Sequence, residues 1–309
     1  MVAPLRIAVT GGTGFVGSRL LAALGNEGHE VRALARRPMD DSPGQTWIAG
    51  SLEEPQALER LAEGADALIH VAGVINADEA GFEAGNVQGT AAVVKAAKSR
   101  GVRRMVHVSS LSAREPQLSR YGASKARSET LVRDSGLDIA IVRPPAVYGP
   151  GDRETLDLFR MARRGVILLP PEGRLSLIHA DDLARLLIAL AAAKTPPPLV
   201  EPDDGKPGGW THREFAAALG EAVGRKGMAL SMPRAAVRFG ALLDRLIRRD
   251  RAKLTPDRAA YFCHPDWVVD PALVPPPALW APAIDTRQGL RATAEWYRGE
   301  RLLRDSWRG

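Results

Sequence analysis

Short apolar runs alternate with longer amphipathic stretches through the first 145 residues. The apolar runs predict five strands, at 5–10, 30–35, 67–72, 104–109 and 138–142. Between them the sequence predicts helices at 15–24, from apolar positions at helical spacing, and at 54–62, at 86–99 before Gly101 and at 120–133 before Gly136. Strands that alternate with helices of this length pair in parallel through right-handed crossovers. The pattern therefore predicts an α/β fold with a doubly wound parallel sheet of the Rossmann type.

The periodicity becomes less regular after Pro144. It predicts further helices at 156–164, 183–193, 211–223, 233–249 and 286–303, and a strand at 175–178. Asp182 is placed to cap the helix at 183–193, and a proline-rich extended stretch precedes the last helix. We expect residues 1–150 to form one domain, to which 175–202 returns. Residues 151–309 should form a smaller, mainly helical lobe.

Charge is distributed unevenly along this chain of 309 residues. The sequence has 42 Lys and Arg against 36 Asp and Glu, a formal net charge of +6. Residues 225–260 alone carry ten basic and three acidic side chains, so the rest of the chain is close to neutral. A nucleic-acid partner is therefore not expected, whereas a local patch that faces an anion or a membrane stays open.

The helix predicted at 233–249 carries much of this charge. It is basic at several positions and apolar at Val237, Leu242, Leu243, Leu246 and Ile247. A basic amphipathic helix can lie on a membrane surface. It can equally attach a lobe through its apolar stripe and leave the other face in solvent. We favour the second interpretation.

Cysteine content and hydropathy exclude several classes of protein. The single cysteine, Cys263, allows neither an intrachain disulfide nor a cysteine-rich zinc site, and we expect no metal. The longest apolar run, 186–193, is far shorter than the ~18–20 residues that span a bilayer. No apolar signal region precedes the first predicted strand. We therefore expect a cytoplasmic protein.

A glycine cluster joins the first predicted strand to the first helix. Gly11 permits a tight turn, Gly14 lets the backbone approach a pyrophosphate, and Gly17 allows close packing of helix on strand. Phosphates then bind the N–H groups at the positive end of the helix. The cluster predicts a dinucleotide site in the 1–150 domain, which leaves substrate binding to the second lobe. The predicted cofactor contacts here are Gly11, Thr13, Gly14, Phe15, Val16 and Gly17.

The choice between the two nicotinamide cofactors is made at the end of the second strand. Sites for NAD usually place an acidic residue there, which binds the ribose 2′-hydroxyl. This chain has Ala35, followed by Arg36 and Arg37. A guanidinium can pair with a 2′-phosphate through two hydrogen bonds, whereas an acid would repel it. We therefore expect NADP(H) in preference to NAD(H).

Three polar residues form a candidate catalytic set. Ser110 follows the fourth strand, and Tyr121 and Lys125 lie four residues apart on one face of the next helix. Tyr121 can deliver a proton to a carbonyl oxygen if the ammonium of Lys125 lowers the tyrosine pKa by favouring the phenolate. Ser110 would hydrogen-bond the same oxygen. In the reverse direction Tyr121 becomes the base for alcohol oxidation.

With these motifs the sequence resembles the extended short-chain dehydrogenase/reductase superfamily, in particular the NAD-dependent epimerase/dehydratase family. The resemblance covers nearly the whole chain and includes further motifs at 70–73, 143–152, 177–183 and 289–297. The resemblance implies that Lys125 also holds the nicotinamide ribose, that Ser109 is structural, and that Asn86 is structural or relays protons. The further cofactor contacts that it implies are Ser51, Leu52, Val71, Ala72, Gly73, Tyr121, Lys125, Pro144, Ala146 and Val147.

Departures from the family pattern narrow the reaction. Ala146 stands where nucleotide-sugar members commonly carry Asn, and Leu111 and Ser112 stand where sugar dehydratases carry Asp and Glu. Ser51 replaces an Asp that contacts adenine. We expect an NADP(H)-dependent oxidoreductase that acts on a carbonyl or secondary alcohol of a small molecule, with Tyr121 as general acid/base. A nucleotide-sugar epimerase with retained NAD and a non-catalytic NADPH-binding accessory subunit stay open. Family members often dimerise, so a homodimer through the helix of Tyr121 and its predecessor is expected.

Overall fold

The computed structural model describes residues 4–248 and 256–303 and divides into two compact units. The first unit comprises Met1–Pro144, Ala180–Pro202 and Asp270–Ala281. The second comprises Pro145–His179, Asp203–Val269 and Pro282–Gly309. These limits differ from the expected lobes, because the returning segment begins at Ala180 and a proline-rich stretch after residue 269 also joins the first unit.

A parallel sheet of seven strands forms the centre of the first unit, in the order β11-β6-β5-β4-β1-β2-β3. Its strands are β1 Arg6–Thr10, β2 Glu30–Ala35, β3 Gln45–Ala49, β4 Ala67–His70, β5 Arg104–Val108, β6 Asp138–Val142 and β11 Leu199–Val200. The predicted doubly wound sheet is confirmed. Strand β3 was not predicted, because most of its side chains are only partly buried and its residues show no apolar run.

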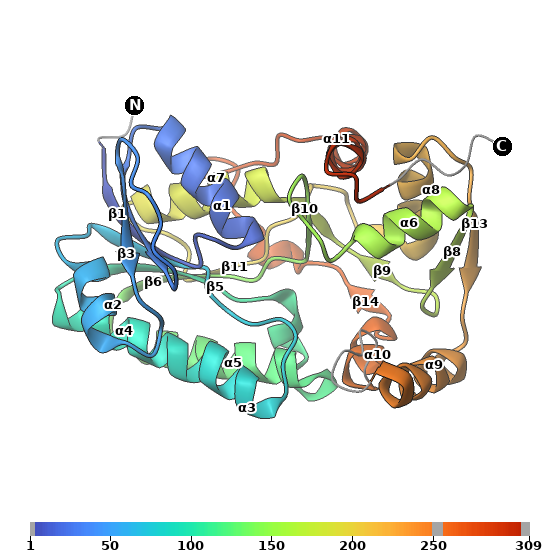
Figure 1. The fold of residues 1–309 in the computed structure, drawn as a ribbon, viewed down its shortest axis with the longest axis horizontal. Coiled ribbons are helices and arrows are strands. Elements are labelled where there is room, and N and C mark those ends of the chain that lie inside the picture. The colour runs from blue at the N-terminus through green and yellow to red at the C-terminus, as the bar shows by residue number, and fades with distance from the viewer. Residues whose placement is uncertain (1–3, 249–255, 304–309) are drawn as a thin grey trace. The chain divides into compact units, whose positions relative to one another are not determined.

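Helices cover both faces of this sheet. Figure 1 shows α1 (Phe15–Asn26) and α7 (Ala180–Ala192) on one face. It shows α2 (Pro55–Ala62), α4 (Gly89–Ser99) and α5 (Arg120–Arg133) on the other. Short helix α3 (Glu79–Phe82) and a π-helical turn at Glu83–Gln88 precede α4, so the helix predicted from Asn86 begins earlier. Buried side chains such as Leu58, Val93, Met105 and Ile141 fill the space between the sheet and α2, α4 and α5.

Hydrogen bonds hold the returning segments in the first unit. Arg104 in β5 donates from Nη1 to the carbonyl oxygens of Leu190 (2.8 Å) and Ala193 (2.6 Å), and so satisfies the end of α7. The backbone of the proline-rich stretch pairs with Glu201, since Glu201 N donates to Leu273 O at 2.8 Å. Trp280 donates from Nε1 to Asp182 O at 3.0 Å. Asp182 itself lies inside the first turn of α7, so the prediction that it caps this helix was wrong.

The second unit is built from short strands as well as helices. Its helices are α6 Leu156–Arg164, α8 His212–Ala222, α9 Arg234–Arg248, α10 Pro256–Phe262 and α11 Thr286–Gly299. Its strands are β7 Ala146–Tyr148, β8 Val166–Leu169, β9 Arg174–Leu175, β10 Leu177–His179, β12 Trp210–Thr211, β13 Met228–Ser231 and β14 Asp266–Trp267. The strand predicted at 175–178 is therefore divided between β9 and β10. Tyr148, Phe159, Leu219, Leu290 and Tyr297 are central members of a separate core.

Candidate active site

The turn between β1 and α1 needs glycine for steric reasons. Gly11 has a φ of +76°, and a Cβ there would lie 2.6 Å from the backbone nitrogen of Ala72. A Cβ on Gly17 would lie 2.0 Å from the carbonyl oxygen of Gly11. Both distances are shorter than the separations that non-bonded atoms keep from a Cβ in proteins. Any residue other than glycine at either position would therefore displace backbone. The turn thus lies directly on the loop that follows β4.

The amino end of α1 has the features of an anion site. Gly14 caps the helix without a side-chain hydrogen bond, and no acidic residue lies in the first turn. The first N–H groups of a helix have no acceptor within it and carry partial positive charge. Thr13 and Gly14 are exposed, whereas Phe15 and Val16 are partly buried. These features fit a dinucleotide pyrophosphate, because a cradle that a Cβ would fill lies beside free backbone donors.

The residues predicted to select the cofactor lie at the carboxyl end of β2. Ala35 is buried at the end of the strand, and Arg36 and Arg37 are exposed directly after it. Neither arginine forms a hydrogen bond or ion pair with another residue in the described part of the chain. Ser51 accepts a hydrogen bond at Oγ from Glu53 N at 3.2 Å, in the loop that β3 leads into. Both guanidinium groups are thus available to an anionic ligand.

The remaining predicted cofactor contacts fall into two places. Ala72 is fixed by its backbone nitrogen, which donates to Thr10 Oγ1 at 3.3 Å, and Gly73 is exposed after it. Partly buried Leu52 and Val71 and buried Pro144 also lie in the first unit. Ala146 and Val147 lie in β7 of the second unit. Their expected contact with the nicotinamide stays a prediction.

Ser110 and Tyr121 meet at the carboxyl edge of the sheet. Ser110 follows β5 and caps a 3-10 turn at Leu111–Arg114, where its Oγ accepts from Ser112 N at 3.2 Å and from Ser112 Oγ at 2.9 Å. With its acceptor positions engaged, the Ser110 hydroxyl is left to donate. Tyr121 lies in the first turn of α5, forms a side-chain hydrogen bond with Ser110, and has its ring 6.0 Å from that of Phe82.

Lys125 lies one turn further along α5 and is buried. Its ammonium donates to the carbonyl oxygen of Val108 at 2.8 Å. Burial lowers the pKa of Lys125 to about 8, and the carboxylate of Glu129 acts in the opposite direction. A Cβ on Gly73 would lie 3.8 Å from Lys125 Nζ, so the exposed loop after β4 passes close to this ammonium.

The expected lowering of the Tyr121 pKa by Lys125 was wrong. Burial raises the pKa of Tyr121, and the hydrogen bond to Ser110 works against that rise. The Lys125 ammonium donates its hydrogen bond to Val108 O. Tyr121 is therefore a protonated phenol over the physiological range.

Glu129 is a buried residue of this site that sequence reasoning missed. Its carboxylate accepts from Ser109 Oγ at 2.6 Å, from Arg143 Nε at 2.8 Å and from Arg133 Nη2 at 2.7 Å. Burial alone would raise the pKa of Glu129, but the bonds from Arg143, Ser109 and Arg133 hold it below its usual value. Glu129 lies four residues after Lys125 and therefore on the same face of the helix. This spacing is the sequence signal that could have identified Glu129 as a site residue.

Asn86 joins the loop after β4 to α5. Its Oδ1 accepts from Val74 N at 2.8 Å, and its Nδ2 donates to Val74 O at 3.0 Å and Ser124 Oγ at 2.9 Å. Ser124 in turn donates to Tyr121 O at 2.8 Å. All the polar atoms of the Asn86 amide are thereby used within the protein, which is the arrangement expected of a structural residue.

Two buried histidines lie behind the site. His70 in β4 and His107 in β5 stack with their ring centroids 5.3 Å apart. Burial, aided by the nearby Lys125 ammonium, lowers the pKa of His70 to about 3 and that of His107 well below its usual value. His70 bonds Thr10 Oγ1 at 2.6 Å, the same oxygen that holds Ala72. The neutral imidazole thus links β4 to the start of the dinucleotide turn.

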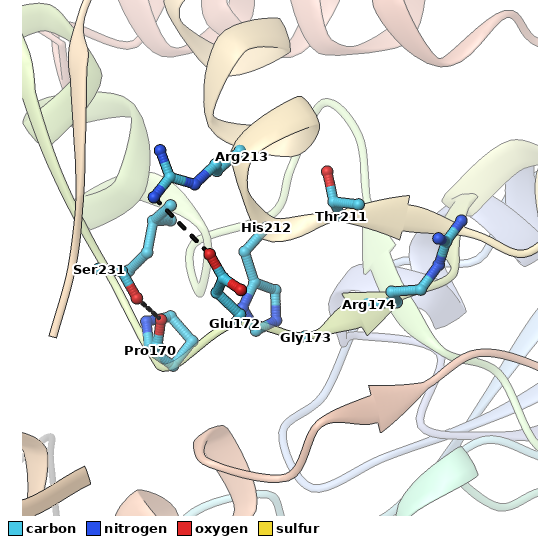
Figure 2. Close-up of a pocket in the computed structure, with 9 residues that line it drawn as sticks. Pro170, Glu172, Gly173, Arg174, Thr211, His212, Arg213 and Ser231 are labelled. Atoms are coloured by element: carbon cyan, nitrogen blue, oxygen red, sulfur yellow. Dashed lines mark hydrogen bonds and ion pairs between the residues drawn. The ribbon is translucent and has the colours of Figure 1, made fainter. Parts of the chain in front are cut away.

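A separate pocket lies in the second unit. It encloses about 400 Å³ between β8, β9 and the start of α8, as Figure 2 shows. Its lining residues are Leu169, Pro170, Glu172, Gly173, Arg174, Thr211, His212, Arg213 and Ser231. The polar groups are engaged locally, since Ser231 Oγ donates to Pro170 O at 3.1 Å and Arg213 pairs with Glu172 at 3.8 Å. None of these residues was predicted as a site residue.

Comparison with known proteins places the chain in a family. A family model described as the NAD dependent epimerase/dehydratase family matches residues 7–200, more than half of the chain. The chain belongs to this family. A relative named ceramide reductase, from Caulobacter vibrioides, is 37% identical over 94% of this chain and 94% of its own length. A relative named 2-alkyl-3-oxoalkanoate reductase, from Stenotrophomonas maltophilia, is 29% identical over 93% of this chain and 98% of its own.

Solved structures of the family agree with the fold. MoeE5 in complex with UDP-glucuronic acid and NAD superposes with a TM-score of 0.70 at 21% identity, over 96% of this chain and 99% of that chain. The UDP-glucose 4-epimerase of Thermotoga maritima gives 0.69 at 19% identity, over 96% and 99%. From family and relatives together, this family member is an NAD(P)-dependent oxidoreductase of the extended short-chain dehydrogenase/reductase type.

The described residues contain neither a metal-ligand cluster nor a helix that could span a membrane. Within residues 4–248 and 256–303, no three His, Cys, Asp or Glu side chains are grouped so that they could hold a metal ion. Over the same residues, no helix combines the length and apolar character needed to cross a bilayer.

Replacement of Gly11 should disrupt cofactor binding through the backbone of Ala72. We expect Gly11→Ala to weaken NAD(P)H binding at least tenfold in a fluorescence titration. Gly28→Ala is the matched control, because Gly28 has the same φ of +76° but no atom within 4 Å of an added Cβ. Both variants should lose about 1–2 kcal/mol of stability through backbone strain. If Gly11→Ala and Gly28→Ala bind the cofactor with equal affinity, the dinucleotide does not bind at the turn between β1 and α1.

Proposed function

We propose that this family member is an NADP(H)-dependent reductase of a ketone carried on a long hydrocarbon chain. The observation that carries the proposal is the hydrogen bond between Ser110 and a protonated Tyr121, one helical turn from the buried ammonium of Lys125. A binding protein without catalysis would have no use for a buried lysine held beside a phenol at this edge of the sheet.

The three residues divide the work of carbonyl reduction. When bound, the reduced nicotinamide supplies a hydride to the carbonyl carbon. Ser110 donates a hydrogen bond to the carbonyl oxygen, and Tyr121 Oη transfers its proton to that oxygen as negative charge develops. Below its pKa of about 8, Lys125 is an ammonium one helical turn from Tyr121, and it must turn from Val108 O to stabilise the phenolate left on Tyr121. The phenolate then regains a proton from solvent.

The buried residues after Ser110 favour this reaction over dehydration. Elimination of water needs an additional acid and base beside the carbonyl. Here Leu111 is buried, and Ser112 is buried with its hydroxyl donated to Ser110. Neither can act as an acid or base at neutral pH. A simple reductase, which needs only one proton donor, is therefore the better fit.

The substrate class is inferred from the relatives. The names ceramide reductase and 2-alkyl-3-oxoalkanoate reductase both designate compounds with long hydrocarbon chains, and both relatives align over more than nine-tenths of this chain. Transfer of that chemistry to this protein suggests a 3-oxo or related ketone next to an alkyl chain. A cytoplasmic location and a homodimer through α4 and α5 stay predictions.

Removal of the phenol hydroxyl tests the proposed mechanism. We expect Tyr121→Phe to lower kcat for ketone reduction by about 10²–10⁴-fold, because the carbonyl oxygen loses its proton donor. The dissociation constant for NADPH should change less than threefold. Tyr261→Phe, which removes a hydroxyl from the other unit, is the control and should keep full activity. Unchanged turnover in Tyr121→Phe would refute Tyr121 as the acid.

Cofactor preference is tested at Arg36. We expect Arg36→Ala to weaken NADPH binding by at least tenfold, since a charge-assisted bond to the 2′-phosphate is worth about 1.5–3 kcal/mol. NADH affinity should not change. The control is Arg103→Ala, at another exposed arginine of the first unit. Tighter binding of NADH than NADPH in the unmodified protein would contradict the preference.

The activity should fall as pH rises past about 8. Above that pH Lys125 loses its proton and no longer stabilises the Tyr121 phenolate, while the raised pKa of Tyr121 keeps the phenol protonated. The Glu129 carboxylate raises the pKa of Lys125, so Glu129→Gln should move this alkaline limb to lower pH. The measurement is kcat/KM for reduction between pH 6 and 10. If the alkaline fall in kcat/KM of Glu129→Gln stays at the same pH, or moves to higher pH, then Lys125 does not set this fall.

A further inference from the structure

Helix α9 of the second unit presents its large apolar side chains to solvent. Phe239 is 63% exposed, Leu242 58% and Leu246 77%. Their spacing of three and four residues places them on one face of the helix. Ala241, on another face, is fully buried, and Val237 is partly buried. The sequence had suggested an apolar stripe that attaches this helix to the lobe. Two members of that stripe, Leu242 and Leu246, are exposed instead. The side chains of Leu243 and Ile247 lie outside the described part of the structure.

The packing of α9 leaves this face uncovered by the described residues. Among the described elements, α9 packs mainly on α10, as Figure 1 shows in orange. Soluble proteins rarely expose several large apolar side chains next to one another. A contiguous exposed apolar patch of this kind marks an interaction site.

The strand that precedes α9 carries exposed apolar side chains of its own. β13 pairs in parallel with β8, with Met228 opposite Val166 and Leu230 opposite Leu168. These four side chains are 37–58% exposed. The alternate residues of β8, Ile167 and Leu169, point the other way and are buried in the core of the unit. One face of this two-stranded ribbon is thus apolar and solvent-exposed.

The charge of this region restricts the kind of partner that it fits. Residues 225–260 carry a net charge of +7, and Arg234 and Arg238 are exposed on the first turns of α9. A twofold contact between two copies through this face would bring the two basic segments together, which is unfavourable. A negatively charged apolar surface complements both properties at once. An anionic lipid bilayer is such a surface.

We propose that the exposed apolar face of α9, formed by Phe239, Leu242 and Leu246, docks the protein on an anionic lipid bilayer. Phe239, Leu242 and Leu246 enter the boundary between headgroups and acyl chains, and Arg234 and Arg238 lie at the lipid phosphates. This surface lies outside the candidate active site, and its binding does not depend on the proposed reductase activity.

Co-sedimentation of the full-length protein with vesicles tests the proposal. We expect binding to vesicles of phosphatidylcholine with 30% phosphatidylglycerol, and at least tenfold weaker binding to phosphatidylcholine alone. The combined variant Phe239→Ser, Leu242→Ser and Leu246→Ser should lower the partition coefficient on the anionic vesicles at least tenfold. Arg234→Gln and Arg238→Gln should each lower it about fivefold, and 0.5 M salt should have a similar effect.

A matched control separates this surface from general hydrophobicity. Val274 is 42% exposed in the first unit, and Val274→Ser should leave vesicle binding unchanged. Circular dichroism and NADPH affinity establish that each variant is folded. The proposal is overturned if the folded protein does not bind anionic vesicles. It is also overturned if the triple serine variant binds as tightly as the unmodified protein, or if that variant instead dissociates an oligomer seen by sedimentation.

Discussion

The burial of two charged side chains on one helix, Lys125 and Glu129 of α5, is the constraint on which the candidate active site depends. An unpaired charge inside a protein is costly, so each needs partners in the sheet below. Lys125 finds the carbonyl of Val108, and Glu129 finds Ser109 and two arginines. These bonds fix the rotation of α5 against β5. Tyr121, one turn before Lys125, is thereby held beside Ser110.

The same constraint explains why distant segments return to the first unit. Arg143, which binds Glu129, also reaches Glu201 at 3.3 Å, and Glu201 is fully buried after β11. Glu201 accepts in turn from Asp270 N at 2.9 Å, at the start of the proline-rich stretch. A chain of charge-assisted bonds thus runs from the active-site helix to residues about 140 positions further on. Loss of Arg143 would remove a partner from both buried carboxylates at once.

The sequence predicts the parts of the fold that follow simple periodicity. Helix α5 was predicted with its observed limits, and the parallel sheet follows from alternation of strand and helix. The buried face of α5 could not be predicted in this way. Its buried members include Ser124, Lys125, Ser128 and Glu129, so the usual search for an apolar stripe finds nothing there. Only the chemistry of Tyr121 and Lys125 pointed to this helix.

Other features depend on environment that sequence spacing does not contain. The pKa of Tyr121 is raised because its phenol is desolvated, and this burial is not visible in a four-residue spacing. Leu242 and Leu246 were recognised as apolar positions of the basic helix, but their exposure to solvent was not predicted. A hydrophobic stripe is expected to face a core, and α9 is an exception that only three-dimensional packing reveals.

We propose that this site reduces a ketone by direct hydride transfer with Tyr121 as the acid. The most direct measurement uses NADPH deuterated at the nicotinamide C4 and a panel of long-chain 3-oxo compounds, with products analysed by mass spectrometry. We expect a secondary alcohol with one deuterium on the carbinol carbon, formed in equal amount to the oxidised cofactor. Cofactor that binds tightly but is oxidised by none of these ketones, or sugar nucleotides converted with no net oxidation, would contradict it.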